Sequence, residues 1–185
     1  MARTRLQPAD RRDQLIDFGR EHFAAHAFDA LAVEQIATLA GVSKGTIYKY
    51  FGGRRGFYVA TITTVVDELL AAMTPPPDGN AMEVLTTMTG AFVRYAAENR
   101  GIYLALVQGG LGADEEVSAL LDRVRATAVA HVVEVSGYGE VSPSLDLVLA
   151  GWVSFVEATT ARWLVKERPV SEDELVEMFA LNLAH

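Results

Sequence analysis

The sequence predicts an all-α protein, with three short helices near the N-terminus followed by a longer helical bundle. Apolar residues recur at helical spacing between breaks at proline and glycine. No run alternates apolar and polar residues between turn signals as a strand of a sheet does. With 185 residues, 50% hydrophobic and 22% charged, the composition is typical of a folded globular chain and excludes a mainly disordered one.

Capping and turn residues place the N-terminal elements. Asp10 is the expected N-cap of the first helix, Gly41 breaks the chain after the second, and Ser43 caps the third. Gly52 and Gly53 end the third helix before a longer one begins. The expected helices span residues 10–26, 33–40, 44–51 and 54–73.

A proline-rich connection at residues 75–80 cannot continue a helix and separates two regions. In the second region the best-marked helix start is Ser171, where Glu174 at the third position completes a capping box. The helices expected there span residues 81–98, 101–109, 114–136, 144–166 and 172–184.

The segment Leu145 to Val165 is mostly apolar and long enough to be mistaken for a membrane span. Asp146, Glu157 and Arg162 interrupt it, and an ionised carboxylate is costly in hydrocarbon. We therefore expect a helix buried in protein, and no membrane partner.

Charge is distributed unevenly along the chain. Residues 1–58 hold 9 Lys and Arg against 6 Asp and Glu, a net +3, while residues 59–185 hold 7 against 18, a net −11. A basic head on an acidic body suits contact with a polyanion at one end only. Zero cysteines exclude disulfides and thiolate sites, and the lack of an apolar stretch behind the first arginines argues against a signal peptide, so we expect a cytoplasmic protein.

The basic segment contains the pattern of a helix-turn-helix motif. In residues 36–51, IATLAGVSKGTIYKYF, small Ala37 and Ala40 permit two helices to cross closely, and Gly41 permits a sharp turn. Ile47 and Phe51 lie four residues apart and are expected to face inward. The outward face then carries Lys44, Gly45, Tyr48 and Lys49.

These residue types suit contact with DNA. Lys44 and Lys49 can donate to guanine or to phosphate, hydroxyls such as that of Thr46 can donate to phosphate, and Gly45 permits close approach of the backbone. Arg54 adds a cation at a helix N-terminus, where an anion is already favoured. A solvated helix with a few lysines is the alternative that these residues alone leave open.

The stretch FDALAVEQIATLAGVSKGTIYKYFGGRRGFY, within about residues 10–60, resembles the TetR family of transcriptional regulators. The resemblance implies base-edge or groove positions for Lys44, Gly45, Tyr48 and Lys49, and phosphate contacts for Thr46, Tyr50 and Arg54. It also implies a DNA-binding domain over 1–58 and a ligand-binding and dimerisation domain over 59–185.

Several positions depart from the family pattern. Leu31 and Ala32 stand where a Thr or Ser is usual, so the second helix lacks a side-chain N-cap worth about 1 kcal/mol. Ala27 replaces a common glycine. Arg55 occupies a position that is often Glu, and we expect it to contact phosphate rather than to be merely a solvated charge.

The segment 144–166 has two apolar stripes, so we expect this helix to be covered by other protein on two sides. One stripe is mostly small, and the other is largely aromatic with Trp152, Phe155 and Trp163. We expect the small stripe, with helix 172–184, to form a homodimer interface, although packing of both stripes within one subunit is the alternative. The small stripe comprises Leu147, Gly151, Ser154, Ala158, Ala161 and Val165.

The aromatic stripe is expected to close a cavity for a small apolar or aromatic effector, as the resemblance implies. For any one of the candidates, ordinary core packing is the alternative. The candidate ligand-binding residues are Met88, Phe92, Tyr95, Tyr103, Val107, Trp152, Phe155 and Thr159. The four histidines show no ligand spacing, so neither metal nor cofactor is expected.

The expected function is a dimeric DNA-binding regulator, a repressor released from a pseudo-palindromic operator by a small apolar ligand. An activator, or a constitutive binder without effector, uses the same parts. A helical-bundle enzyme is the other class considered. Against it, Glu157 has no visible nucleophile, metal set or second carboxylate, and is expected to satisfy Arg162 or a backbone group.

Overall fold

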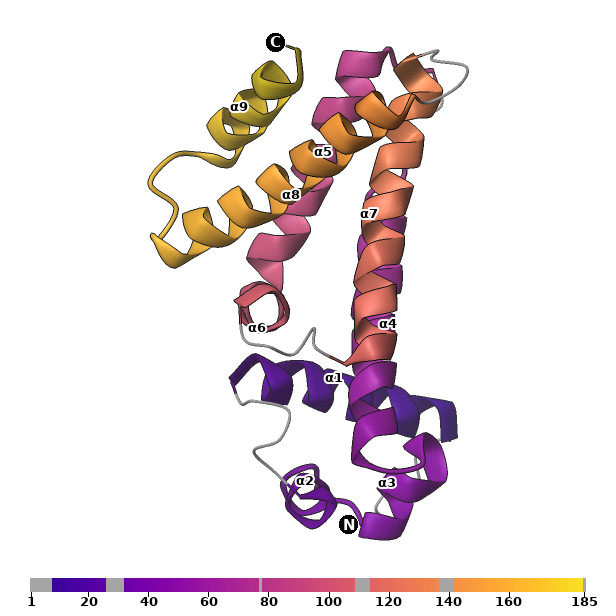
Figure 1. Ribbon diagram of the computed structural model, residues 1–185. Helices are drawn as coiled ribbons and strands as arrows, with labels where there is room; N and C mark the ends of the chain where they lie inside the picture. The colour runs from indigo at the N-terminus through magenta and orange to yellow at the C-terminus, as the bar shows by residue number, and fades with distance from the viewer. Residues whose placement is uncertain (1–7, 26–31, 77, 109–113, 137–141, 185) are drawn as a thin grey trace.

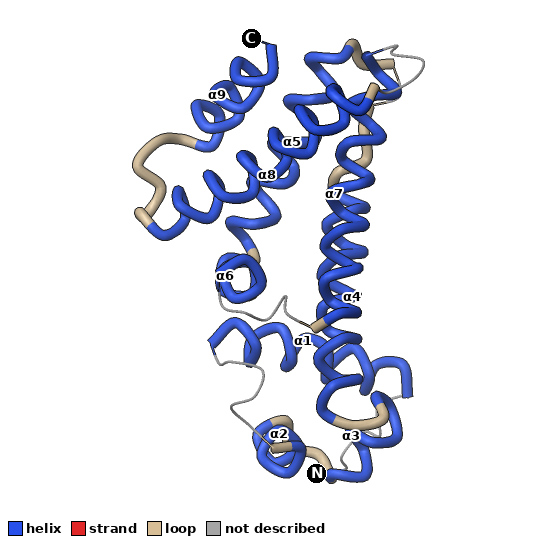
Figure 2. The backbone as a smooth tube through the Cα atoms, in the orientation of Figure 1, coloured by secondary structure: helices blue, strands red, loops and turns tan. Residues whose placement is uncertain are grey.

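A computed structural model describes residues 8–25, 32–76, 78–108, 114–136 and 142–184 of the chain. Within these ranges all regular structure is helical, as the sequence predicts, and no strand is present (Figure 2). The helices are α1 (Pro8–Ala25), α2 (Val33–Leu39), α3 (Lys44–Phe51), α4 (Arg54–Ala72), α5 (Ala81–Glu98), α6 (Arg100–Gln108), α7 (Glu115–Ser136), α8 (Pro143–Val165) and α9 (Glu172–Ala184).

The molecule is elongated, with a head and a body (Figure 1). The head consists of α1, α2, α3 and the start of α4, and the body holds the remaining helices. Helix α4 runs from the head into the body alongside α7, so the expected boundary between residues 58 and 59 falls inside one continuous helix. At 1.5 Å per residue, the 19 residues of α4 span about 28 Å.

Local capping chemistry accounts for several helix boundaries. The Ser43 hydroxyl accepts from the Thr46 amide at 3.2 Å, and Gly52 ends α3 in the left-handed region with φ 73°. Ser171 and Glu174 form the predicted capping box, and Asn80 with Glu83 forms another that the sequence analysis overlooked. The expected cap at Asp10 is wrong, because α1 already begins at Pro8.

The core of the head is closely packed around aromatic rings. Phe23 contacts Phe57 and Tyr58, with ring centroids 5.6 and 5.1 Å apart, and Phe51 lies 5.0 Å from Phe57. Aromatic contacts at these distances stabilise beyond the apolar area that they bury. The start of α4 is thereby fixed to the helix-turn-helix.

Helix α1 also packs against α6 of the body. A side chain at Gly101 would place its Cβ 2.6 Å from that of Ala24, and one at Gly19 would meet the Thr61 hydroxyl at 2.5 Å. Both distances are shorter than van der Waals contact. The two glycines therefore permit α1 to lie close to α6 and α4, where head and body meet.

The body core is built on α5, α8 and α9. The Trp152 indole donates to the backbone oxygen of Phe179 at 3.0 Å, and the Trp163 indole donates to that of Val170 at 2.8 Å. One side of α8 is thus buried within the subunit. Among the described helices, none is long and apolar enough to cross a membrane.

Candidate functional site

Helix α3 presents one side to the head core and the other to solvent. Ile47 and Phe51 are buried, as their spacing predicts. Four residues on the opposite side are exposed: Lys44, Gly45, Tyr48 and Lys49. A turn through Gly41, with φ 66°, joins α2 to α3 and holds α3 at the end of the molecule (Figure 1).

The lysines of α3 are ordered by neighbouring groups. Lys44 pairs with Glu34 of α2, and its ammonium lies 5.7 Å from the centre of the Tyr48 ring. The hydrogen bond between Lys44 and Glu34 lowers the pKa of the glutamate and raises that of the lysine. Lys49 lies 5.6 Å from the centre of the Tyr50 ring. Both lysines are exposed, so a phosphate can compete for either of them.

Gly45 has free space around it. A Cβ at this position would meet only the Ser43 hydroxyl, at 3.7 Å, so internal packing does not require glycine here. Thr46 is half-buried with its hydroxyl 2.9 Å from that of Ser43. Tyr50 and Arg54 are also half-buried, and Arg54 begins α4.

Arg55 is exposed but paired with carboxylates of the same chain, which the sequence did not predict. Its Nε and Nη2 donate to the two carboxylate oxygens of Asp114 at 2.8 and 3.0 Å, and its Nη1 lies 3.1 Å from Glu116. Hydrogen bonding by Arg55 lowers the pKa of Asp114. Sequence reasoning failed here because Asp114 lies 59 positions away. Arg55 ties the head to the start of α7.

The missing cap of α2 is partly replaced. Ala32 is the N-cap residue and has no side-chain acceptor. The Gln35 side chain instead accepts from the Ala32 amide at 2.9 Å. This satisfies one free amide of the first turn. Ala27 and Leu31, the other departures from the family pattern, lie outside the described residues.

The body encloses a cavity of about 350 Å³ next to α4. Ligand sites are typically about 300–1,000 Å³ and mostly apolar with a few polar groups, and this cavity fits that description. Its walls come from five helices and the residue that ends α5. The lining residues are Val65, Val66, Leu69, Phe92, Tyr95, Ala96, Asn99, Ile102, Tyr103, Leu106, Val107, Ser118, Leu121, Val124, Arg125 and Glu157.

The candidate ligand residues divide into three groups. Phe92, Tyr95, Tyr103 and Val107 line the main cavity. Met88 and Trp152 line a smaller void of about 40 Å³, whose wall shares Phe92, Val124 and Glu157 with the main cavity.

Phe155 and Thr159 line neither space, which corrects the expectation for both. Phe155 is on the outer side of α8, with its ring 5.6 Å from that of Phe179. Trp152 and Phe155, three residues apart on α8, both contact Phe179 of α9, and only Trp152 also reaches the smaller void.

Helices α4 and α7 contribute wall residues that the sequence did not predict. Val65, Val66 and Leu69 of α4 line the cavity, as does the charged Arg125 of α7. Its position contains a usable signal: Arg125 follows Leu121 by four residues and precedes Ala128 by three, so it interrupts an apolar stripe. A charge on such a stripe is a candidate for a buried contact.

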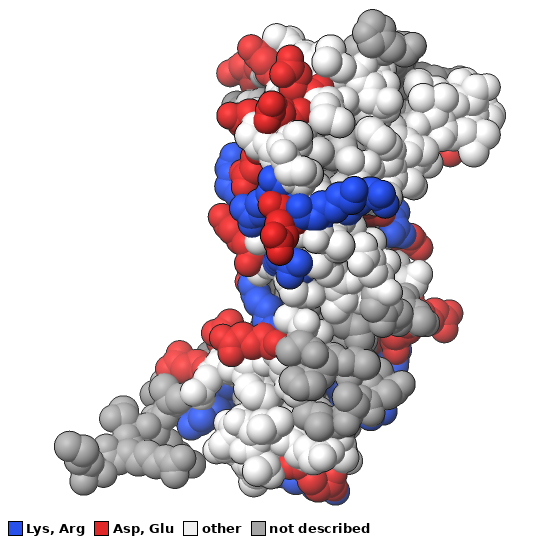
Figure 3. Space-filling view, turned by 90° about the vertical axis from the view of Figure 1, so that its left-hand side faces the viewer, with Lys and Arg blue, Asp and Glu red and all other residues white. Residues whose placement is uncertain are grey.

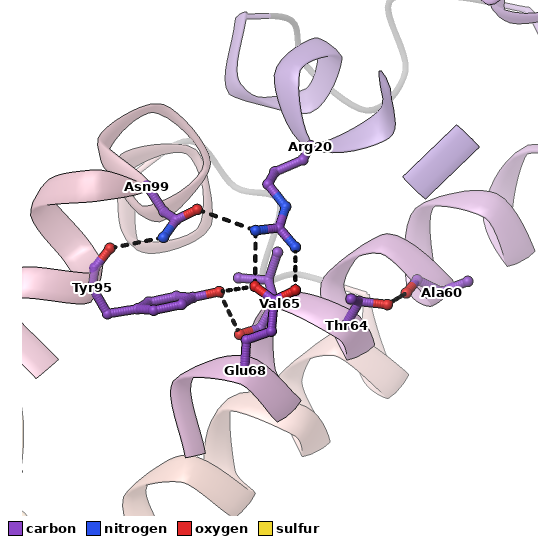
Figure 4. A network of polar contacts seen from close by, with 7 residues as sticks. All are labelled: Arg20, Ala60, Thr64, Val65, Glu68, Tyr95 and Asn99. Atoms are coloured by element: carbon purple, nitrogen blue, oxygen red, sulfur yellow. Dashed lines mark hydrogen bonds and ion pairs between the residues drawn. The ribbon is translucent and has the colours of Figure 1, made fainter. Parts of the chain in front are cut away.

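A polar network connects the cavity wall to the head (Figure 4). Arg20 of α1 donates to both carboxylate oxygens of Glu68 on α4, at 2.7 and 2.8 Å. The Tyr95 hydroxyl lies 2.9 Å from the Val65 oxygen and 3.0 Å from Glu68. Asn99 accepts from Arg20 at 3.4 Å.

The network changes the titration of its members. The hydrogen bond from Arg20 lowers the pKa of Glu68, and burial together with the neighbouring carboxylate raises that of Tyr95. Tyr95 and Asn99 also line the cavity. A molecule in the cavity therefore touches groups that hold α1.

The opposite end of the cavity is also charged. Arg125 donates from Nε to the carboxylate of Glu157, at 3.1 and 3.2 Å, and from Nη1 to Asp122 at 2.8 Å. Burial raises the pKa of Glu157 despite this partner. The expected partner of Glu157, Arg162, lies on the exposed side of α8. No group of His, Asp and Glu within the described residues is arranged to hold a metal ion.

An apolar surface remains on the outside of the body, on α8 and α9. Of the small stripe, Ala161 is buried within the subunit, which corrects its assignment, whereas Gly151, Ser154 and Ala158 are exposed. Figure 3 shows a broad area with few charged residues at the upper right, beside a cluster of acidic residues at the upper left. The large exposed apolar residues of α8 and α9 are Leu147, Val148, Phe155, Val165, Met178 and Leu181.

Two family models match the chain. Residues 15–61 match the family described as bacterial regulatory proteins, tetR family. Residues 81–182 match a tetracyclin repressor-like C-terminal domain. The first match covers the helix-turn-helix and the second covers most of the body.

Individual relatives agree with these matches. The HTH-type transcriptional activator FasR of Mycolicibacterium smegmatis is 24% identical over 179 residues, which cover 94% of this chain and 81% of that protein. The HTH-type transcriptional repressor KstR2 of the same species is 26% identical, covering 95% of this chain and 90% of that protein. The crystal structure of a tetR-family regulator from Streptomyces coelicolor superimposes with a TM-score of 0.84 at 27% identity, covering 97% of this chain and 81% of that one.

Proposed function

The chain belongs to the TetR family of transcriptional regulators, and from this membership we propose that it is a homodimeric, ligand-released repressor. Proteins of this family bind DNA, and the matched relatives are regulators rather than enzymes. The proposal adds three elements to the family assignment: a recognition surface, a dimer interface, and a cavity that controls the head.

The exposed side of α3 is proposed to enter the major groove. Lys44, Tyr48 and Lys49 carry the donors, and the free space at Gly45 allows the DNA backbone to approach. Lys44 is already paired with Glu34. When DNA binds, phosphate or guanine therefore replaces the glutamate as the partner of Lys44. Thr46, Tyr50 and Arg54 are proposed to contact phosphates beside it.

The apolar surface of α8 and α9 is proposed to bind a second copy of the chain. Regulators of this family bind DNA as dimers, and an exposed apolar face of this kind on a body helix marks an interface. Gly151, Ser154 and Ala158 allow the partner helix to approach closely. Two-fold symmetry of the dimer then requires a pseudo-palindromic operator.

The observation that carries ligand control is the double role of Tyr95 and Asn99. Both line the cavity, and both belong to the network that reaches Arg20 on α1. The bridge from Arg55 to Asp114 gives a second connection, because Asp114 directly precedes α7, whose Ser118 and Leu121 also line the cavity. A ligand that moves these walls changes how the head is held.

The test uses two tyrosine variants. An operator is first selected from random duplex DNA with the purified chain, and a ligand is selected by thermal shift. Tyr95→Phe removes a cavity hydroxyl that reaches the head network, whereas Tyr103→Phe removes one that donates only to the backbone oxygen of Glu157.

We expect the ligand to weaken operator binding by about 5–150-fold in the wild type and in Tyr103→Phe, and by several-fold less in Tyr95→Phe. Operator DNA must weaken ligand binding by the same factor. An operator affinity that no ligand changes would favour a constitutive DNA binder. A ligand that strengthens operator binding would favour a corepressor or an activator, and FasR shows that relatives include proteins named as activators.

A further inference from the structure

The charged end of the main cavity restricts the chemistry of a ligand. Arg125 contacts two carboxylates, those of Glu157 and Asp122. When all three groups are ionised, the cluster carries one net negative charge. The guanidinium is therefore already neutralised, and one carboxylate is in excess.

Glu157 is the most buried of the three groups. Its side chain is 18% exposed, against 39% for Arg125 and 66% for Asp122. Burial raises the pKa of its carboxyl even beside Arg125, so its charge is incompletely compensated. A further cation or hydrogen-bond donor from the cavity side stabilises such a group.

An anionic head group meets the opposite situation. To reach the Arg125 guanidinium it must displace Glu157 or lie next to it. The first leaves a buried carboxylate without its partner, and the second places two like charges within a few Å. The acidic body, with 18 Asp and Glu against 7 Lys and Arg over residues 59–185, adds long-range repulsion of the same sign.

Two aromatic rings lie beside this carboxylate. The Tyr103 hydroxyl donates to the backbone oxygen of Glu157 at 2.8 Å, which holds its ring at this end of the cavity. The Phe92 ring lies 5.8 Å from that of Tyr103, edge to face, and Phe92 and Glu157 line both the main cavity and the smaller void. Aromatic faces attract ammonium groups, so the rings and the carboxylate favour the same kind of charge.

We propose that the cavity binds an apolar molecule carrying one cationic amine, with the ammonium beside Glu157 and the rings of Phe92 and Tyr103. The apolar part lies along α4, α5 and α6. A volume of about 350 Å³ accommodates roughly a dozen non-hydrogen atoms at ~30 Å³ each. The inference rests on the proposed function, which makes the cavity an effector site, and adds the charge of the head group.

Three probes with one apolar body test it: 4-phenylbutylamine, 4-phenylbutan-1-ol and 4-phenylbutanoate. Dissociation constants are measured at pH 7 by calorimetry on the full chain. We expect the amine to bind about tenfold tighter than the alcohol, a factor typical of a charge-assisted hydrogen bond, and the acid to bind most weakly. Glu157→Gln should reduce the advantage of the amine to less than about threefold and leave the alcohol unchanged.

Two further variants test whether the charge of Glu157 is responsible for the advantage of the amine. Glu134→Gln removes an exposed carboxylate on the outer side of α7 and should leave the advantage intact. Asp122→Asn, at an exposed position, removes the net negative charge of the cluster without touching Glu157. It should weaken amine binding several-fold, even if Glu157→Gln fails to fold.

Binding of the acid as tightly as the amine would overturn the amine class while leaving an effector site in place. An advantage that survives both Glu157→Gln and Asp122→Asn would also overturn it. Failure of all three probes to bind would overturn this inference, and a thermal-shift screen with uncharged apolar molecules then shows whether the effector site itself fails.

Discussion

The head and the body carry their candidate sites in opposite ways. On α3 the candidate residues point outward, and the head is held together by different residues, such as Ile47, Phe51 and Phe57. In the body, the candidate residues Phe92 and Tyr103 point inward and are part of the core. Substitutions at an outward site can change binding without altering the fold. At an inward site the same side chains pack the core and contact the ligand, so a substitution affects both stability and binding.

The largest effect is expected from the outward site. Replacing Tyr48 and Lys49 by Ala together should reduce specific operator affinity by about 10³-fold or more, toward non-specific binding. Both side chains are exposed, so the unfolding midpoint should hardly move. Mobility shift and thermal denaturation measure the two quantities. Arg94→Ala, which removes an exposed cation of α5, is the control, and unchanged affinity in the double variant would refute the recognition role of α3.

The inward site should behave differently. Phe92→Ala removes a buried ring from the wall of both cavities and should destabilise the fold by about 3 kcal/mol while weakening the ligand. Phe155→Ala, on the outer side of α8, should leave ligand affinity unchanged. Urea denaturation and calorimetry give both values. Wild-type stability in Phe92→Ala would contradict the idea that the inward site is also part of the core.

The body also has an outward surface, on α8 and α9. Ala158→Arg places a long cation on its exposed side and should raise the dimer dissociation constant by about tenfold or more, since a buried unpaired charge is strongly unfavourable. Sedimentation velocity measures this change. Ala119→Arg, exposed on α7 away from this surface, should leave assembly intact. A stable Ala158→Arg dimer would assign the interface to another surface.

A smaller effect is expected on the coupling between ligand binding in the body and operator binding by the head. Arg55→Gln breaks the bridge from α4 to Asp114 on the edge of the head, and Arg123→Gln breaks a bridge from α7 to Asp67 farther along the same helices. Only the first should reduce the factor by which a ligand weakens operator binding. Equal coupling in both variants would mean that the Arg55 bridge is merely structural.

The smallest effects are those of pH, and two carboxylates should show opposite signs. The pKa of Glu68 is lowered by Arg20, so its stabilisation is present above the unfolded value of about 4.3 and is lost as pH falls through its folded pKa. The pKa of Glu157 is raised by burial. Its contribution is therefore complete below about pH 4.3 and is lost as pH rises through its folded pKa.

Urea unfolding from pH 3 to pH 7 compares these two groups. Glu68→Gln should lose stability mainly at the upper end of this range. Glu157→Gln should be at least as stable as the wild type at pH 7, because the glutamine avoids burying a charge. A marked loss in Glu157→Gln at pH 7 would show that the pair with Arg125 is net stabilising.

Prediction from sequence succeeded where neighbouring residues decide the structure. The cap at Ser43, the end of α3 at Gly52 and the capping box at Ser171 are confirmed, because each depends on residues within a single turn. The same is true of the inward Ile47 on α3. The match to the TetR family is confirmed on a motif that is likewise continuous in sequence.

It failed where the partner is remote. The pairing of Arg55 with Asp114 and Glu116 could not be predicted, because these partners lie far from Arg55 along the chain. The placement of Phe155 in the cavity is wrong because helical periodicity groups residues by face without saying which face is covered.

The sequence by itself determined the all-α fold, the helix-turn-helix and the basic head, because helix propensity, caps and apolar spacing act over a few residues. Only the tertiary structure decided which charges meet. The bond from Arg20 to Glu68 joins residues 48 positions apart, and that from Arg125 to Glu157 joins residues 32 apart. Such pairs depend on how whole helices pack, and the cavity that they border is the space that this packing leaves unfilled.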